Sequence, residues 1–232
     1  NSRPMSDPKP IPARPGATTG GIARRVMFQC LAVMSVSFHV GDVGATEPAP
    51  EFQEAAGIVA ELHGVLGEMM RNADALGYPG RYQLIDPVVS QRFDTPLIVK
   101  VILSRHWNEL NDAEKTEFIQ LFHQLSAATY AARFDSFSGQ EFAETGREQL
   151  TAGRILIRTE LRRPDEPPVK LDYLMHQNDR GEWRIISVIA NGVNDLSLKR
   201  AEYAVVIRER GFPGLLEDIR RKIQDMENGR ES

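Results

Sequence analysis

The sequence predicts an α+β fold in which helices from both ends of the chain cover an antiparallel sheet. Three observations lead to this fold class. Apolar residues recur at helical spacing from about residue 51 to 134, at a spacing of two from about 140 to 190, and at helical spacing again after 194. A chain that runs helices, meander, helices is typical of a single α+β domain.

The first predicted helix carries one apolar stripe, and a break follows it. The stripe consists of Ile58, Leu62, Val65, Leu66 and Met69. Residues 73–80 contain two glycines and a proline and are expected to interrupt the helix. A second helix is predicted over about 81–91, with a kink at Pro87.

Further helix boundaries follow from their capping residues. Pro96 suits the first turn of a third helix. Asn111 and Glu114 form the pattern of a capping box before a fourth. Asn194 is expected to cap a helix that ends near Gly211, and a last amphipathic helix is predicted over 215–226.

Alternation predicts four strands joined as a meander. A weak strand opens at Phe142, and 154–162 and 169–176 alternate clearly. Turns are expected at 163–168, which holds three prolines, and at 178–181. Over 183–190 the period places Trp183, Ile185 and Ile189 on one face, and Ile186, Val188 and Ala190 on the other. Both faces of this strand are apolar, so each must be covered.

The N-terminal residues have the pattern of a secretory signal peptide. Arg24 and Arg25 precede an apolar run over 26–38, which is too short for a spanning helix, and small residues follow at 43–45. We expect cleavage near Ala45, with 1–45 as extension and signal peptide and 46–232 as one domain. The domain would be periplasmic. It would also lack cysteine, because Cys30 is the only cysteine in the chain.

The composition and motifs disfavour several function classes. A net charge of −4 does not suit a nucleic-acid partner, which requires a basic surface. The chain has no nucleophile elbow and no phosphate-binding glycine loop, and its histidines do not have zinc-ligand spacing. We therefore expect no enzymatic activity, no cofactor and no metal.

Apolar content is the positive signal, and it suggests a cavity between the sheet and the helices. Ten residues on the inward faces of the predicted elements are candidates to line a lipid-binding cavity. They are Leu66, Met69, Ile102, Phe122, Leu125, Ile157, Leu171, Tyr173, Ile186 and Val188. An enzyme with a polar group inside the same cavity, or a module that binds a peptide in an apolar groove, are the alternatives.

The order of several residues resembles the MlaC family of periplasmic phospholipid carriers. In the helical half the resemblance rests on Phe93-Asp94, Trp107, the cap at 111–114, Phe118, Phe122, Leu125 and Tyr130. In the C-terminal half it rests on Trp183, Gly192-Val193, Arg200, Tyr203, Gly211-Phe212 and Leu215-Leu216. The stretch 190–203 is more similar to HpnM, the branch of this family found in hopanoid-producing bacteria.

This resemblance implies a fold, a cargo and partners. The fold would be a twisted antiparallel sheet, similar to that of nuclear transport factor 2, wrapped by helices. The cargo would be a phospholipid or a hopanoid with its apolar part between sheet and helices. The partners would be an inner-membrane ABC transporter with its substrate-binding subunit, and an outer-membrane lipoprotein complex.

Overall fold

The computed structural model describes residues 50–151 and 153–230. Its sheet is an antiparallel meander in the order β1-β2-β3-β4-β5. The strands are β1 (Glu141–Thr151), β2 (Arg154–Arg163), β3 (Glu166–Gln177), β4 (Trp183–Ala190) and the short β5 (Val193–Asn194). The predicted signal peptide and its cleavage site lie outside the described residues.

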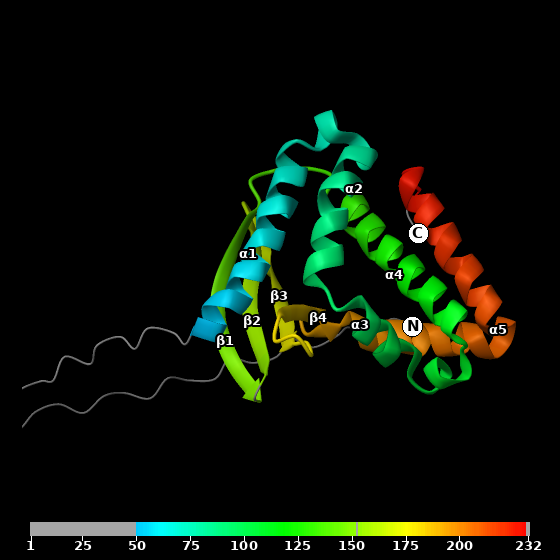
Figure 1. The fold of residues 1–232 in the computed structure, drawn as a ribbon. Helices are drawn as coiled ribbons and strands as arrows, with labels where there is room; N and C mark the ends of the chain where they lie inside the picture. The colour runs from blue at the N-terminus through cyan, green and yellow to red at the C-terminus, as the bar shows by residue number, and fades with distance from the viewer. Residues whose placement is uncertain (1–49, 152, 231–232) are drawn as a thin grey trace, which may run out of the picture. The chain divides into compact units, whose positions relative to one another are not determined.

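Helices precede and follow the strands in the sequence. They are α1 (Pro50–Arg71), α2 (Ala73–Arg92), α3 (Thr95–Leu103), the 3₁₀ helix η1 (Ser104–Glu109), α4 (Asp112–Arg133) and α5 (Asp195–Glu227). Figure 1 shows α1 lying across the strands, and α4 and α5 lying side by side. The predicted α+β class and the predicted capping box of Asn111 and Glu114 are confirmed.

Two helices contain a break of the same kind. Gly77 interrupts α2 with φ 56° and ψ −176°, and Gly211 interrupts α5 with φ 70° and ψ 178°. Each glycine opens a similar tetrapeptide, at 77–80 and 211–214, in which an aromatic residue, a proline and a second glycine follow. The first glycine takes a conformation that other residues avoid, and the proline starts the next helical segment.

The interruption predicted over 73–80 is confirmed at Gly77, whereas the dihedral angles at Pro87, where a kink was expected, are helical. This proline lies within α2, and the residue with non-helical dihedrals is Gly77, ten positions earlier. Ile85, Val88 and Val89 around the proline are buried. Their packing offsets the hydrogen bond that Pro87 cannot make.

The expected turn at 163–168 is shorter than predicted, because β3 begins at Glu166 and includes Pro167 and Pro168. Pairing of β3 with β4 starts only at Leu171, so the first residues of β3 have a partner strand on one side alone. Proline is tolerated at such an edge, where its missing N–H breaks no ladder bond.

A β-bulge corrects the predicted faces of β4. Ile185 pairs with Met175 and Ser187 pairs with Leu174, so Ile186 is an extra residue on β4. The alternation shifts by one position after it. Val188 therefore lies opposite Tyr173 on the face that Ile185 occupies, and Ile189 lies on the other face opposite Asp172.

Two apolar clusters form the core of the described residues. The sheet-side cluster joins α1, α2 and the end of α4 to the strands, and the helical cluster joins α3, α4 and α5. The sheet-side cluster consists of Ala55, Ala56, Ile58, Val59, Leu62, Leu66, Met69, Ile85, Val88, Val89, Ala127, Ala131, Ile155, Ile157, Tyr173, Met175, Trp183 and Ile185. The helical cluster consists of Ile98, Val99, Ile102, Leu103, Leu110, Phe118, Leu121, Phe122, Leu125, Tyr203, Leu215, Leu216 and Ile219.

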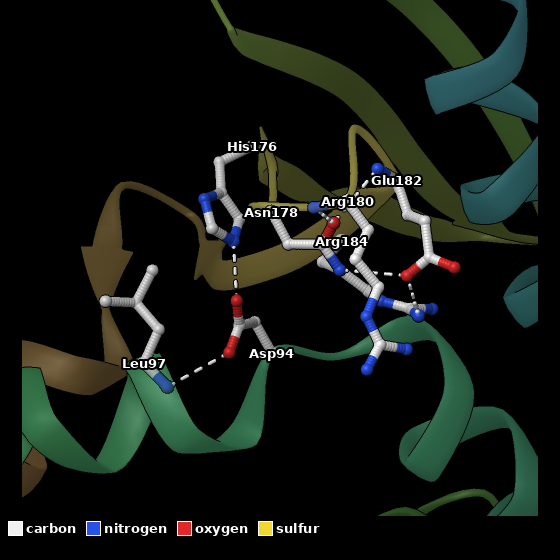
Figure 2. Close-up of polar contacts among 7 residues, drawn as sticks. All are labelled: Asp94, Leu97, His176, Asn178, Arg180, Glu182 and Arg184. Carbon is white, nitrogen blue, oxygen red and sulfur yellow. Dashed lines mark hydrogen bonds and ion pairs between the residues drawn. The ribbon is translucent and has the colours of Figure 1, made fainter.

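Asp94 joins the helical part of the domain to the sheet (Figure 2). One carboxylate oxygen accepts from the backbone N–H of Leu97, 3.0 Å away, and so caps α3. The other lies 2.7 Å from Nε2 of His176 on β3. The backbone N–H of Asp94 donates to the carbonyl oxygen of Ile185 on β4. Next to this junction, Asn178 accepts from the backbone N–H groups of Arg180 and Glu182 and forms the predicted turn.

The junction gives a first testable prediction. Asp94→Ala removes a helix cap and a bond to a histidine, and we expect it to lower the free energy of unfolding by about 2–4 kcal/mol. Asp94→Asn keeps an oxygen for the cap and is expected to lose less than half of that. Urea unfolding measures both variants, and equal stability of the alanine variant and the original chain would contradict the assignment.

Candidate functional site

The structure divides the ten predicted lining residues between the two clusters. Six belong to the sheet-side cluster or pack against it, namely Leu66, Met69, Ile157, Tyr173, Leu171 and Val188. Three belong to the helical cluster, namely Ile102, Phe122 and Leu125. The tenth, Ile186, is the bulge residue of β4 and is buried. One continuous wall of all ten is therefore not present, and the six sheet-side residues form the coherent candidate.

These six residues lie where α1 crosses the sheet. Ile157 on β2 pairs with Tyr173 on β3, and Tyr173 pairs with Val188 on β4. These three side chains therefore form one row across three neighbouring strands. Leu66 and Met69 come from α1 and are fully buried. Leu171 and Val188 are only partly buried.

A pocket opens beside this cluster, between the first half of α1 and the edge strand β1. Its volume is about 340 Å³, and its lining consists of Gln53, Ala56, Gly57, Ala60, Glu144 and Arg147. On the α1 side these residues are small, and an added Cβ at Gly57 would meet nothing within 4 Å. The pocket borders the sheet-side cluster, because Ala56 lines it and also belongs to that cluster.

An ion pair lies at the mouth of this pocket. Nε of Arg147 is 2.5 Å from Oε1 of Glu144, and its Nη2 is 3.1 Å from Oε2. Nη1 of the same guanidinium donates to the carbonyl oxygen of Phe52 at the start of α1. Arg147 pairs with Ile157 and Glu144 with Thr159 across the ladder, so both charges lie on the apolar face of the sheet. The pocket thus has an ion pair on its β1 side and small residues on its α1 side.

Deeper between α1 and the sheet lies one polar pair. Nε2 of His63 is 3.0 Å from the hydroxyl oxygen of Tyr173. The imidazole stacks on the ring of Phe142, with centroids 4.0 Å apart and planes at 11°. Burial lowers the pKa of His63 from 6.5 to about 4, so the ring is neutral at pH 7. Burial likewise raises the pKa of the Tyr173 hydroxyl well above 10.

Sequence reasoning did not select His63. The sequence indicates only that the four histidines after Ala45 lack zinc-ligand spacing, and in the structure each has a hydrogen-bond partner on at least one ring nitrogen. A signal for its position was nevertheless present. His63 is four residues after Val59 and three before Leu66, so it borders the buried stripe of α1.

The depressed pKa predicts how stability depends on pH. An unfolded chain binds a proton at His63 near pH 6.5, whereas the folded chain does so only near pH 4, so stability falls as the pH drops through this window. The contribution of His63 to this fall is expected to be about 2–3 kcal/mol between pH 7.5 and 4.5. His63→Phe should remove it. His123→Gln, at a histidine bound to Asp86, is the control and should keep it. Urea unfolding at both pH values tests this, and an unchanged pH slope in His63→Phe would contradict it.

The remaining histidines of the described residues pair with carboxylates. His106, His123 and His176 each bind one carboxylate, from Glu109, Asp86 and Asp94 respectively. Within 50–151 and 153–230, no group of three or more His, Cys, Asp or Glu side chains could hold a metal ion. The same residues include no helix that is long and apolar enough to span a membrane.

Comparison with known proteins decides the family. Residues 63–221 match the family described as MlaC protein. The chain belongs to the MlaC family. This match covers most of the chain, including all five strands and most of the helical residues. MlaC proteins are lipid carriers and not enzymes.

A solved structure has the same fold as this MlaC-family chain. It is the phospholipid-binding protein from Ralstonia solanacearum, in complex with a phospholipid. The TM-score is 0.65 at 18% sequence identity, and the match covers 75% of this chain and 97% of the other. The match confirms the predicted arrangement of an antiparallel sheet covered by helices.

Proposed function

We propose that this MlaC-family protein carries one lipid through water, with the apolar part of the lipid between the sheet and helix α1. The observation that carries the proposal is the pocket between α1 and β1, which has an ion pair on one side and borders the sheet-side cluster. Family membership and the phospholipid bound by the Ralstonia solanacearum protein support the same function.

The energetics explain what such a carrier must provide. Burying one methylene group is worth about 0.8 kcal/mol, so two chains of about 16 carbons cost about 25 kcal/mol to expose to water. No catalytic group lowers this cost; only apolar area does. The described pocket of about 340 Å³ is at the small end of ligand sites. Loading therefore requires α1 to move away from β1, so that the buried side chains below it become the wall.

The rim of the pocket suits a polar headgroup. A phosphate can replace Glu144 as the partner of the Arg147 guanidinium, since both offer a pair of oxygens to its planar fork. The neutral His63–Tyr173 pair lies deeper, where it can bond to an ester or hydroxyl oxygen without burying a charge. A phospholipid satisfies both positions.

A hopanoid is the second candidate cargo. Its rigid ring system offers an apolar area similar to that of two acyl chains, and residues 190–203 resemble the HpnM branch. A hopanoid would use the sheet-side cluster and the His63–Tyr173 pair but would leave Arg147 with Glu144.

Location and partners follow from the same proposal. The predicted signal peptide of residues 1–45 would export the chain to the periplasm. From there the carrier can reach both the inner and the outer membrane. An inner-membrane ABC transporter with its substrate-binding subunit, and an outer-membrane lipoprotein complex, would then exchange lipid with it.

Native mass spectrometry of the protein purified from its own periplasm tests this function. We expect a folded species whose mass exceeds that of the chain by one lipid, and extraction identifies that lipid as a phospholipid or a hopanoid. Arg147→Gln should reduce the occupancy of a phospholipid and leave that of a hopanoid unchanged. A protein that carries no lipid but turns over a small apolar substrate, or that retains a peptide, would refute the proposal in favour of an enzyme or a peptide-binding module.

A further inference from the structure

A second pocket lies away from the sheet, where the end of α3 and η1 meet α5. Its volume is about 210 Å³. Its lining consists of Ile102, Leu103, Ser104, Arg105, His106, Arg200, Tyr203, Ala204 and Ile207. One half of this lining is apolar, and the other half carries two guanidinium groups, an imidazole and a hydroxyl. No carboxylate is among the residues that line it.

The two arginines have no acidic partner within the described ranges. Elsewhere on the surface most arginines face a carboxylate: Arg208 is paired with Glu209, and Arg220 with Glu117. Arg105 forms no ion pair with any residue in 50–151 or 153–230. Arg200 donates instead to Oγ of Ser104, at 2.8 Å. Two positive charges therefore face one pocket without neutralisation.

His106 also lines this pocket, and one of its ring nitrogens is unsatisfied. Its Nδ1 lies 2.8 Å from Oε2 of Glu109, and a carboxylate there fixes a hydrogen on Nδ1. Its Nε2 is buried and has no hydrogen-bond partner in the part of the chain that the structure describes. With its hydrogen on Nδ1, the neutral ring leaves a lone pair at Nε2, so this buried nitrogen is an acceptor that lacks a donor.

The backbone at Ser104 is also unusual. This residue has φ 52° and ψ −120°, outside the conformations that a side-chain-bearing residue normally adopts. The conformation brings the Ser104 hydroxyl to Arg200 across the pocket, from the end of α3 to α5. A strained residue maintained beside two charged groups is typical of a binding site.

We propose that this pocket binds a phosphate group. Ser104 and Arg105 of η1 and Arg200 of α5 line it with hydrogen-bond donors, and a tetrahedral oxyanion offers enough acceptors for all three, whereas a carboxylate offers two oxygens. The volume fits one phosphate, with the apolar half of the lining against a short carbon attachment.

This site is independent of the proposed lipid cavity. It lies on the helical cluster, and Ile102 is its one residue among the ten that the sequence suggested for lipid. The phosphate could come from a soluble phosphate ester or from the headgroups of a membrane to which the carrier docks. The test separates these sources.

Titration of the whole chain with inorganic phosphate and with glycerol 3-phosphate, followed by calorimetry, tests the proposal. We expect saturable binding of one equivalent, weakened at least about tenfold in Arg105→Gln/Arg200→Gln. The control is Arg71→Gln/Arg208→Gln, which removes the same two charges outside the pocket and should bind as the original chain does. Absence of saturable phosphate binding, or an equal loss in both double variants, would overturn the proposal.

Sedimentation with vesicles of phosphatidylglycerol then identifies the source. Binding to vesicles that the Arg105→Gln/Arg200→Gln variant loses, and the control variant keeps, supports a membrane headgroup. Binding of glycerol 3-phosphate without vesicle binding supports a soluble ester. Both outcomes uphold the phosphate site. The lipid content of the two variants is measured in parallel and should be unchanged, so a failure here is distinguishable from a failure of the carrier function.

Discussion

Tryptophan at Leu171 or Val188 is expected to displace the bound lipid and leave the protein folded. Both residues are partly buried against the sheet-side cluster, where the proposed cargo lies. Added bulk in a packed interior costs about 1–3 kcal/mol. If the tryptophan ring destabilises the lipid-bound state by this amount, the affinity for lipid falls about 5- to 100-fold. Native mass spectrometry of the purified variants gives the fraction of chains that carry lipid, and circular dichroism confirms that they fold.

The matched controls for these variants are in the other cluster. Ile119 and Val206 are also partly buried, but they pack against the helical cluster. Ile119→Trp and Val206→Trp introduce the same ring into a comparable environment, and their lipid content should equal that of the original chain. Equal lipid loss in all four variants would place the cargo elsewhere or indicate a general loss of structure.

Alanine in place of Gly77 or Gly211 is expected to give a large loss of stability. Both glycines have φ values of 56–70° with ψ near 180°, a region that is almost restricted to glycine. Each substitution should lower the free energy of unfolding by about 2–3 kcal/mol, because the Cβ adds strain at the break between two helical segments. Thermal and urea unfolding measure the loss.

Gly64→Ala is the control for these two substitutions. Gly64 lies in the middle of α1, is exposed, and has nothing within 4 Å of an added Cβ. Alanine there should raise stability by about 1 kcal/mol, because glycine is a poor helix former. A loss at Gly64 comparable to that at Gly77 would mean that the glycine breaks have no special conformational role.

Much of the fold could be predicted because periodicity reports which side of an element is buried. The stripe of Ile58, Leu62, Leu66 and Met69 is buried as expected, and the alternation of β2 and β3 places Ile155, Ile157, Tyr173 and Met175 in the core. Capping residues predicted the starts of α4 and α5. A cap accepts from a backbone N–H only two or three residues away, so the sequence around it is enough to identify it.

The candidate site was harder to predict, for two physical reasons. Periodicity states that a side chain is buried but not which neighbour buries it, so Ile102, Phe122 and Leu125 of the helical cluster were grouped with the sheet-facing residues. The bulge at Ile186 shifts the alternation of β4 by one residue, and no residue type marks such a bulge.

The polar parts of the site depend on long-range contacts. His63 and Tyr173 are 110 residues apart, and Arg147 reaches the backbone of Phe52 across 95 residues. Each of these side chains has an ordinary local sequence. Only the crossing of α1 over the sheet brings them to one opening.

The position of the cargo is tested most directly by nuclear magnetic resonance of the lipid-loaded protein with labelled isoleucine methyl groups. Ile155, Ile157 and Ile185 belong to the sheet-side cluster, and Ile98, Ile102 and Ile219 belong to the helical cluster. We predict nuclear Overhauser contacts from the hydrocarbon of the lipid to the first three methyl groups and none to the second three. Contacts to Ile98, Ile102 and Ile219 alone would contradict the account.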